Sequence, residues 1–278
     1  MNWKFTPRRS LQPPQTNKQI LLSAAQNFVA RWRLIKVMRD GQMRQIEAGL
    51  VLLSLIGLFV IGWVWDEESV LWFVDLPESW IKLFSLITQL GLSGYLIFIL
   101  IAFCITGLLE QAKARNFVAQ ASLGLYAGRA FFLLSLVLTS GLFSQILKHL
   151  FGRARPKLFD MVGAFHFDAF SISASLASFP SGHTVTAFAT AIGLSWFLPR
   201  WRWPLLIIAA LVGLSRIVLG QHYPSDVVGG ALLAFGSALL LRRAFGNRRI
   251  VFRLTEQGYQ PRRARPLWSL VKKIPLRR

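Results

Sequence analysis

Long apolar runs, separated by short polar or charged stretches, dominate the sequence from about residue 47 to residue 242. A helix needs roughly 20 mostly apolar residues to cross a bilayer. Six segments match this pattern once their flanks are included: 48–65, 94–109, 129–147, 184–198, 204–219 and 227–241. The last three are short and rich in small residues, so we expect them to lie inside the bundle. The pattern predicts an all-α integral membrane protein whose core, residues 47–242, is a six-helix bundle.

The segments outside this core are basic. Residues 1–46 are polar and carry no secretory signal peptide, and residues 243–278 form a basic tail. Apolar residues recur at helical spacing between Leu21 and Ile35, which indicates an amphipathic helix lying on anionic lipid. A loosely structured tail is the alternative, and residues 261–278 allow the same two interpretations.

Charge distribution fixes the expected orientation. Lysine and arginine outnumber aspartate and glutamate by 32 to 12, which alone would suit a nucleic acid or an anionic membrane surface. All but six of these cations fall in the tails or at one set of helix ends, while the acidic, aromatic segment 66–80 falls on the other side. The positive-inside rule then predicts cytoplasmic termini in a bacterial inner membrane and explains the charge without nucleic acid. The six outer cations are Lys82, Lys148, Arg153, Arg155, Lys157 and Arg216.

Neither a metal nor another cofactor is expected. The chain has one cysteine, Cys104, inside an apolar run, so it cannot form a disulfide or a thiolate cluster within one chain. The residues assigned below to the outer cluster include no HExxH motif and no paired carboxylates. The chemistry predicted below therefore uses side chains alone.

Four separated pieces of sequence should meet at the outer face. If the first helix runs outward, the third and fifth end there, near Lys148 and Arg216. The fourth and sixth begin there, at His183 and Asp226. Parts of the chain that are far apart in sequence would thus form one polar cluster.

The cations of this cluster suit a phosphate group. Lys148, Arg155 and Arg216 can compensate the charge on the phosphate oxygens. Ser181 is a plausible N-cap of the fourth helix, and Gly182 would let a backbone N–H approach an anion at that helix N-terminus. A phosphate is the natural ligand of such a set.

Two histidines and a carboxylate exceed what phosphate binding requires. A neutral imidazole can attack phosphorus, and an aspartate hydrogen-bonded to its other nitrogen would stabilise the developing positive charge. His222 and Asp226, four residues apart, have a suitable spacing. His183 then remains to protonate the leaving group and to activate water.

The same residues resemble a known signature. Lys148-x6-Arg155-Pro156, Pro180-Ser181-Gly182-His183 and Ser215-Arg216-x5-His222-x3-Asp226 look like the three motifs of the type-2 phosphatidic acid phosphatase superfamily. The resemblance implies a metal-independent lipid phosphate phosphatase that works through a phosphohistidine on His222, with Asp226 as its partner and His183 as acid and base. It also implies that Lys148, Arg155, Ser181, Gly182 and Arg216 bind the phosphate.

The substrate and the acceptor stay open at this stage. Candidate substrates are undecaprenyl diphosphate, lipid A 1-phosphate, phosphatidylglycerol phosphate and phosphatidic acid, presented by the surrounding membrane lipids. The same intermediate would also allow phosphoryl transfer to another lipid. A non-enzymatic lipid-phosphate binder or transporter is the third possibility, and the oligomeric state is undetermined.

For several polar residues near these motifs, the sequence allows more than one role. His149 is expected on a different helix face from Lys148. Arg153 and Lys157 either contact a lipid headgroup or sit in the interface. The segment 157–179 could place Asp160, His166 and Asp168 around a metal, but its aromatic content favours an interfacial lid. The outer tryptophans, among them Trp63 and Trp80, are expected to form an aromatic belt.

Overall fold

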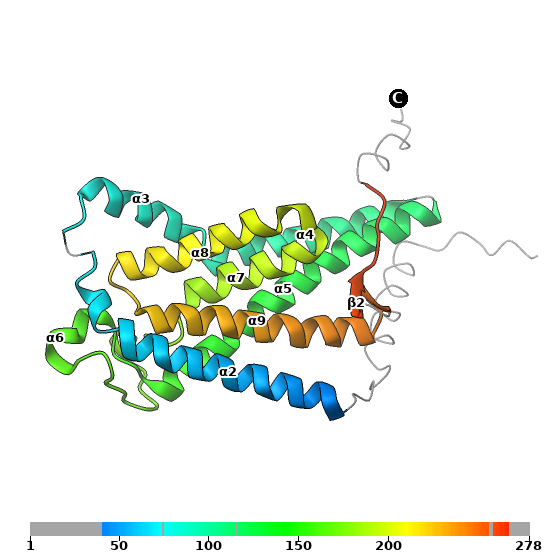
Figure 1. The fold of residues 1–278 in the computed structure, drawn as a ribbon. Coiled ribbons are helices and arrows are strands. Elements are labelled where there is room, and N and C mark those ends of the chain that lie inside the picture. Colours follow the sequence, from blue (N-terminus) through cyan, green and yellow to red (C-terminus); the bar gives the residue numbers. More distant parts are fainter. Residues whose placement is uncertain (1–40, 74, 115, 256–257, 267–278) are drawn as a thin grey trace, which may run out of the picture.

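The computed structural model describes residues 41–73, 75–114, 116–255 and 258–266 (Figure 1). The fold is mostly helical. Its helices are α2 (Gly41–Trp65), α3 (Glu78–Gln89), α4 (Ser93–Lys113), α5 (Phe117–Phe151), α6 (Phe159–Val162), α7 (Gly182–Phe197), α8 (Arg202–Val218) and α9 (Pro224–Asn247). Short 3-10 turns cover Glu68–Val70, Pro156–Leu158, Ala174–Leu176 and Pro199–Trp201. The helix predicted within residues 21–35 lies outside the described residues.

Each of the six predicted apolar segments falls in a helix of its own: α2, α4, α5, α7, α8 and α9. Within the described residues, four helical stretches are long and apolar enough to cross a membrane: 78–113, 117–151, 199–218 and 224–247. The apolar part of α2, Gly49–Trp65, and the 16 residues of α7 are shorter. An integral, mostly helical membrane protein is therefore confirmed, while the number of six crossings stays a prediction.

Helix α7 lies at the centre of the bundle and packs against α5, α8 and α9. Small residues make this packing close. A Cβ added to Gly193 would lie 2.5 Å from a methyl group of Leu133 on α5, and one added to Gly213 on α8 would lie 2.8 Å from Val227 on α9. The last three apolar segments of the sequence were expected inside the bundle. Helix α7 is buried on most sides, as expected, whereas α8 keeps an exposed apolar face that includes Trp203.

A β-hairpin that the sequence pattern did not predict closes one end of the bundle. Strands β1 (Phe252–Thr255) and β2 (Gly258–Pro261) pair antiparallel. The fully buried Phe252 contacts the rings of Phe132, Trp196 and Phe197 at 5.0–5.8 Å between centroids. Part of the segment expected to be a basic tail is thus packed onto the helical core.

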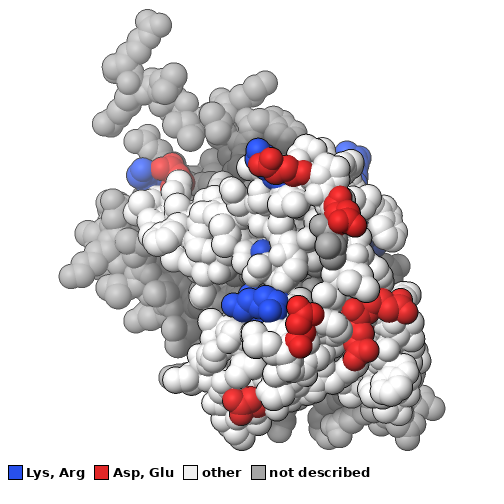
Figure 2. Space-filling view, turned by 90° about the vertical axis from the view of Figure 1, so that its left-hand side faces the viewer, with Lys and Arg blue, Asp and Glu red and all other residues white. Residues whose placement is uncertain are grey.

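The opposite end of the bundle gathers the polar residues of interest. Helices α2, α5 and α8 end there, α7 and α9 begin there, and the segment 156–179 lies across it (Figure 1). Figure 2 shows this end: acidic side chains surround it, and few lysine or arginine side chains are exposed. The arrangement places Lys148, Arg155 and Arg216 beside the histidines of α7 and of the loop before α9. Lys82, also predicted for the outer face, is exposed on α3 and pairs with Glu78.

Candidate active site

The turn after α5 sets the position of the first motif. Gly152 follows the helix with φ of +58°, a left-handed conformation that glycine adopts without steric cost, and its N–H donates to the carbonyl of Lys148 at 2.9 Å. A Cβ at this position would lie 1.6 Å from the carbonyl oxygen of Asp168. The chain can therefore turn here and run beside 166–168 only with glycine at 152.

Three cations, from α5, from the turn after it and from α8, lie close together, and each retains unused donors. Lys148 is buried and donates to a main-chain carbonyl at 2.8 Å. Arg155 donates to Gln221 at 3.3 Å, and Arg216 donates to Thr88 at 2.9 Å. The Nε atoms of both arginines are buried without a hydrogen-bond partner, and no carboxylate pairs with any of the three cations, among the described residues. Uncompensated positive charge of this kind suits an anion.

The N-terminus of α7 borders the cations. Ser181 occupies the N-cap position as predicted, but its hydroxyl accepts a hydrogen bond from the hydroxyl of Thr184 at 2.9 Å and does not bind a helix N–H. Its own N–H donates to the carbonyl of Asp226 at 3.0 Å, which ties the α7 start to α9. Gly182 is the first helical residue, and a Cβ there would lie 3.8 Å from the Cε atom of Lys148. The positive end of the α7 dipole thus lies next to a lysine stem.

His183 follows in the first turn of α7 and is half buried. It interacts electrostatically with Arg216, His222 and Lys148. The break between α3 and α4 packs directly on it, because a Cβ added to Gly91 would lie 2.9 Å from the Cβ of His183. The structure therefore brings His183 into the group of cations and fixes it from the other side.

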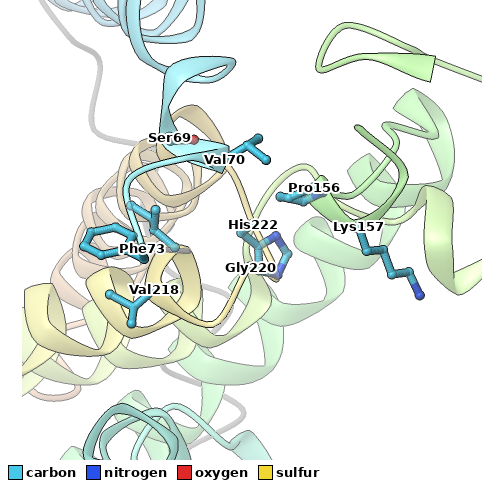
Figure 3. Close-up of a pocket in the computed structure, with 9 residues that line it drawn as sticks. Ser69, Val70, Phe73, Pro156, Lys157, Val218, Gly220 and His222 are labelled. Atoms are coloured by element: carbon cyan, nitrogen blue, oxygen red, sulfur yellow. The ribbon is translucent and has the colours of Figure 1, made fainter. Parts of the chain in front are cut away.

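His222 lies in the loop between α8 and α9, on the wall of a cavity of about 240 Å³. Figure 3 shows its ring with Pro156 and Lys157 on one side and Phe73 and Val218 on the other. Only 3% of the residue is exposed, and this burial lowers the pKa of His222 to about 4, although Asp226 acts to raise it. The imidazole is therefore neutral at neutral pH, as a nitrogen nucleophile must be.

Asp226 stands behind this imidazole. Its Oδ2 atom lies 3.5 Å from the Nδ1 atom of His222, a contact too long to count as a full hydrogen bond. The same oxygen accepts from the hydroxyl of Ser178 at 2.5 Å and from the N–H of Tyr223 at 2.9 Å. The carboxylate is completely buried, so its position is set by these donors and by Arg153, which donates to Oδ1 at 2.8 Å.

The burial of Arg153 and Asp66 departs from the sequence-based expectation. Arg153 was expected at a lipid headgroup or in the interface, and Asp66 in an acidic, aromatic segment at the outer side of the membrane. Both are buried and form an ion pair with an Nη2–Oδ2 distance of 2.7 Å. Burial acts to lower the pKa of Arg153, but the two carboxylates raise it, so this arginine stays charged. Two features of the sequence could have indicated this pair: Asp66 directly follows an apolar helix, and Arg153 is an additional arginine inside the first motif.

The other polar neighbours lie outside the group. Lys157 lines the cavity but is exposed. His149 is exposed, and its Nδ1 atom lies 2.9 Å from the carbonyl of Ser171. In the part of the chain that the structure describes, no three His, Cys, Asp or Glu side chains come together as a metal site would require, and this covers Asp160, His166 and Asp168. The segment 157–179 exposes Met161, Phe170 and Ile172 at 76%, 76% and 89%, as expected of a surface that contacts lipid.

The arrangement suits transfer of a phosphoryl group. A buried neutral imidazole backed by a carboxylate faces a cavity, a second imidazole lies within electrostatic range of the first, and three cations surround both. Charge compensation, a nucleophile and an acid are the elements that phosphate ester cleavage needs.

Comparison with known proteins agrees with this description. The family model described as PAP2 superfamily matches residues 129–250. A lipid A 1-phosphatase from Rhizobium etli is 35% identical over 205 residues, which cover 71% of this chain and 82% of the relative. The undecaprenyl-diphosphatase BcrC of Bacillus subtilis is 47% identical over 58 residues, which cover 21% of this chain and 30% of the relative. A solved transmembrane PAP2 type phosphatidylglycerolphosphate phosphatase from Bacillus subtilis is 24% identical, covers 70% of this chain and 94% of that chain, and has a TM-score of 0.49.

The family model and the long match to the Rhizobium relative decide the class of protein. The fold is that of an integral membrane protein with a cluster of cations and histidines at one end, and the long match to a phosphatase relative shows the family. The chain belongs to the PAP2 superfamily. The predicted resemblance to type-2 phosphatidic acid phosphatases is confirmed.

Proposed function

We propose that this membrane protein is a phosphatase that removes the 1-phosphate of lipid A at the periplasmic face of the inner membrane. The broader class, an enzyme that hydrolyses lipid phosphates, follows from membership of the superfamily and from relatives named as phosphatases. One observation carries the catalytic proposal: the buried neutral His222, backed by Asp226, lines a cavity beside three cations that no carboxylate pairs among the described residues.

The reaction has two steps. Nε2 of His222 attacks phosphorus while the bond from phosphorus to the lipid oxygen breaks, and that oxygen takes a proton from His183. A water molecule then attacks the phosphohistidine, gives a proton to His183 and releases inorganic phosphate, which leaves His222 neutral again. Asp226 stabilises the positive charge that develops on the imidazole. Lys148, Arg155 and Arg216, with the N-terminus of α7 at Ser181 and Gly182, bind the phosphate oxygens.

The choice of lipid A rests on the extent of the match. The Rhizobium lipid A 1-phosphatase aligns over 205 residues, well beyond the motif region, whereas BcrC aligns over only 58. Length matters because headgroup contacts come from parts outside the three motifs. The cavity has such parts: Ser69 and Phe73, which follow α2, contribute to its wall.

The proposed orientation rests on charge. Six crossings, by α2, α4, α5, α7, α8 and α9, place both termini on one side of the membrane. The basic ends of α8 and α9, with Arg200, Arg202 and Arg243, would face the cytoplasm. The acidic end in Figure 2, which carries the candidate active site, would face the periplasm. A cysteine-accessibility experiment with Cys104→Ser as background, labelling Asp160→Cys and Arg200→Cys from outside, tests this orientation.

Phosphate release tests the function. The purified protein in detergent should release phosphate from lipid A, and a lipid A that carries only the 4′-phosphate should remain unchanged by mass spectrometry. Undecaprenyl diphosphate, phosphatidylglycerol phosphate and phosphatidic acid form the comparison panel, and His222→Ala is the inactive control. Faster hydrolysis of another lipid in this panel would overturn the lipid A assignment. Because no acceptor lipid is present, release of inorganic phosphate also separates hydrolysis from phosphoryl transfer.

A further inference from the structure

Arg153 is the centre of a buried polar network that joins α2 to α9. Its Nη1 atom donates to Asp226 at 2.8 Å and to Ser225 at 2.6 Å, and its Nη2 atom donates to Asp66 at 2.7 Å. The same guanidinium binds the carbonyl of Ala164 and stacks over the ring of Tyr223, with 4.5 Å to the ring centroid. Every part of this side chain is therefore held, and 3% of it is exposed.

Asp66 uses both carboxylate oxygens in this network. Oδ1 accepts from the N–H of Ser225 at 2.9 Å, and Oδ2 accepts from the hydroxyl of Ser225 at 2.5 Å and from Arg153. Ser225 is the second residue of α9, so the carboxylate of one helix caps the N-terminus of another. The end of α2 is thereby tied to the turn that carries Asp226.

The network has unequal charge. Two carboxylates share one guanidinium, so one negative charge in excess is left among Asp66, Arg153 and Asp226. Asp226 is the member that faces His222, at 3.5 Å. The fraction of its charge that acts on the imidazole depends on how strongly Arg153 is neutralised by Asp66.

We propose that Asp66 and Arg153 are positioning residues of the phosphatase: through Arg153 and Ser225, Asp66 fixes the carboxylate of Asp226 and sets its effect on His222. This inference rests on the proposed function, since it needs His222 as the nucleophile. Asp66 lies outside the residues that the family model matches, so the three motifs do not include it. The first helix of the bundle would then take part in setting the reactivity of the nucleophile without touching substrate.

The test compares two substitutions, each of which replaces a buried charged side chain by a neutral one. The two charges that are removed have opposite signs. Asp66→Asn removes a negative charge, which leaves Arg153 to act on Asp226 alone and destabilises the imidazolium. We expect kcat to fall about tenfold with KM within about twofold, and the acidic limb of the kcat–pH profile to move to lower pH by about half a unit. Arg153→Gln removes a positive charge and should move the same limb to higher pH.

The remaining charged groups around His222 are the same in all of these variants. They are Lys148 on α5, Arg155 in the following turn, His183 on α7, Arg216 on α8 and Asp226 on α9, with Tyr223 beside Arg153. Glu68→Gln is the matched control, because it removes an exposed carboxylate two residues from Asp66. It should leave kcat and the pH profile as in the wild type.

The outcomes separate this inference from the proposed function. Full-length protein is assayed for phosphate release from the preferred lipid between pH 3 and pH 9, so that the acidic limb and its shift both fall inside the measured range. Rates are expressed per monodisperse folded molecule. A wild type without turnover would overturn the proposed function and this inference with it. If the wild type is active and the acidic limbs of the kcat–pH profiles of Asp66→Asn and Arg153→Gln lie at the same pH, the inference is overturned while the proposed function stands. Should either variant fail to fold, Ser225→Ala keeps all charges and removes the hydroxyl between Asp66 and Arg153; unchanged kcat there would likewise overturn it.

Discussion

Oδ2 of Asp226, in the first turn of α9, lies 3.5 Å from Nδ1 of His222, in the loop that precedes this helix. His222 ends the loop before the helix, and Asp226 is its third residue, whose carboxylate accepts from the N–H of the N-cap residue Tyr223 at 2.9 Å. The geometry of a helix start therefore sets the separation of the two groups. The local backbone structure of five residues, 222–226, therefore orients the nucleophile and its partner.

Asp226→Asn tests this pairing. The amide keeps the shape of the side chain but cannot stabilise an imidazolium, so kcat should fall by about 10³–10⁴ with KM little changed. Arg153 keeps its partner Asp66, so the buried charges stay balanced one to one and the fold should survive. Steady-state phosphate release, with a circular dichroism check of helicity, measures the effect; a loss below tenfold would contradict the assigned role.

Acid should destabilise the protein in a defined pH window. The pKa of His222 is about 4 in the folded protein against 6.5 for an ordinary histidine, because burial disfavours the charged ring. Above pH 6.5 the His222 ring is neutral in both the folded and the unfolded protein, so this residue does not make the free energy of unfolding depend on pH. As pH falls from 6.5 to 4, the unfolded state takes up a proton that the folded state does not, so stability declines by on the order of 3 kcal/mol.

Thermal unfolding in detergent between pH 8 and pH 4 checks this sign. The wild-type midpoint should drop over that window, and His222→Gln, which cannot titrate, should drop less. Equal slopes for the two proteins would show that another group causes the acid lability. Below pH 4 the His222 contribution should be constant.

Much of the site could be predicted because it follows from helix direction. Because α5 and α8 end at the end of the bundle where α7 and α9 begin, Lys148, Arg216, His183 and Asp226 must lie at one end. The apolar runs fix those directions almost completely. The spacing of four residues between His222 and Asp226 then predicts that these two side chains interact.

The remaining features depend on contacts between elements that are distant in the chain. Asp66 is buried because α2 packs against the start of α9, and no pattern within residues 66–80 encodes that contact. Strands β1 and β2 are four residues each, too short for a clear alternation. Phe252 is buried because it packs against α5, α7 and α9. Tertiary packing decides both.

Arg216→Lys tests the phosphate cradle. Lysine keeps the charge but loses the planar fork, so a phosphate held by two parallel donors should bind less well in the transition state. We expect kcat/KM to fall about a hundredfold, with part of the loss in KM. Arg200→Lys, at the opposite end of the bundle, is the control and should be unaffected; a similar loss there would point to a general effect on folding.

Activity should withstand a chelator. Phosphate release is measured with EDTA at a concentration well above that of trace divalent cations, before and after dialysis. Because three cations and two imidazoles can supply charge compensation, nucleophile and acid, we expect less than a twofold change. Loss of activity that added Mg²⁺ or Zn²⁺ restores would contradict the metal-free reaction.

Gly91→Ala probes the second histidine without altering it. The new Cβ would lie 2.8 Å from Val212, 2.9 Å from the Cβ of His183 and 3.1 Å from its carbonyl oxygen, so the start of α7 must shift. A misplaced acid should slow hydrolysis of a lipid phosphate, whose leaving oxygen needs a proton, by about tenfold or more. The rapid first release of 4-nitrophenolate from 4-nitrophenyl phosphate, which precedes the water step and whose leaving group needs no proton, should slow much less. Gly94→Ala meets no atom within 4 Å and serves as the matched control. Equal losses on both substrates would indicate general damage to the site, whereas the selective loss, partly reversed by adding Val212→Ala, is the result that assigns the acid role to His183.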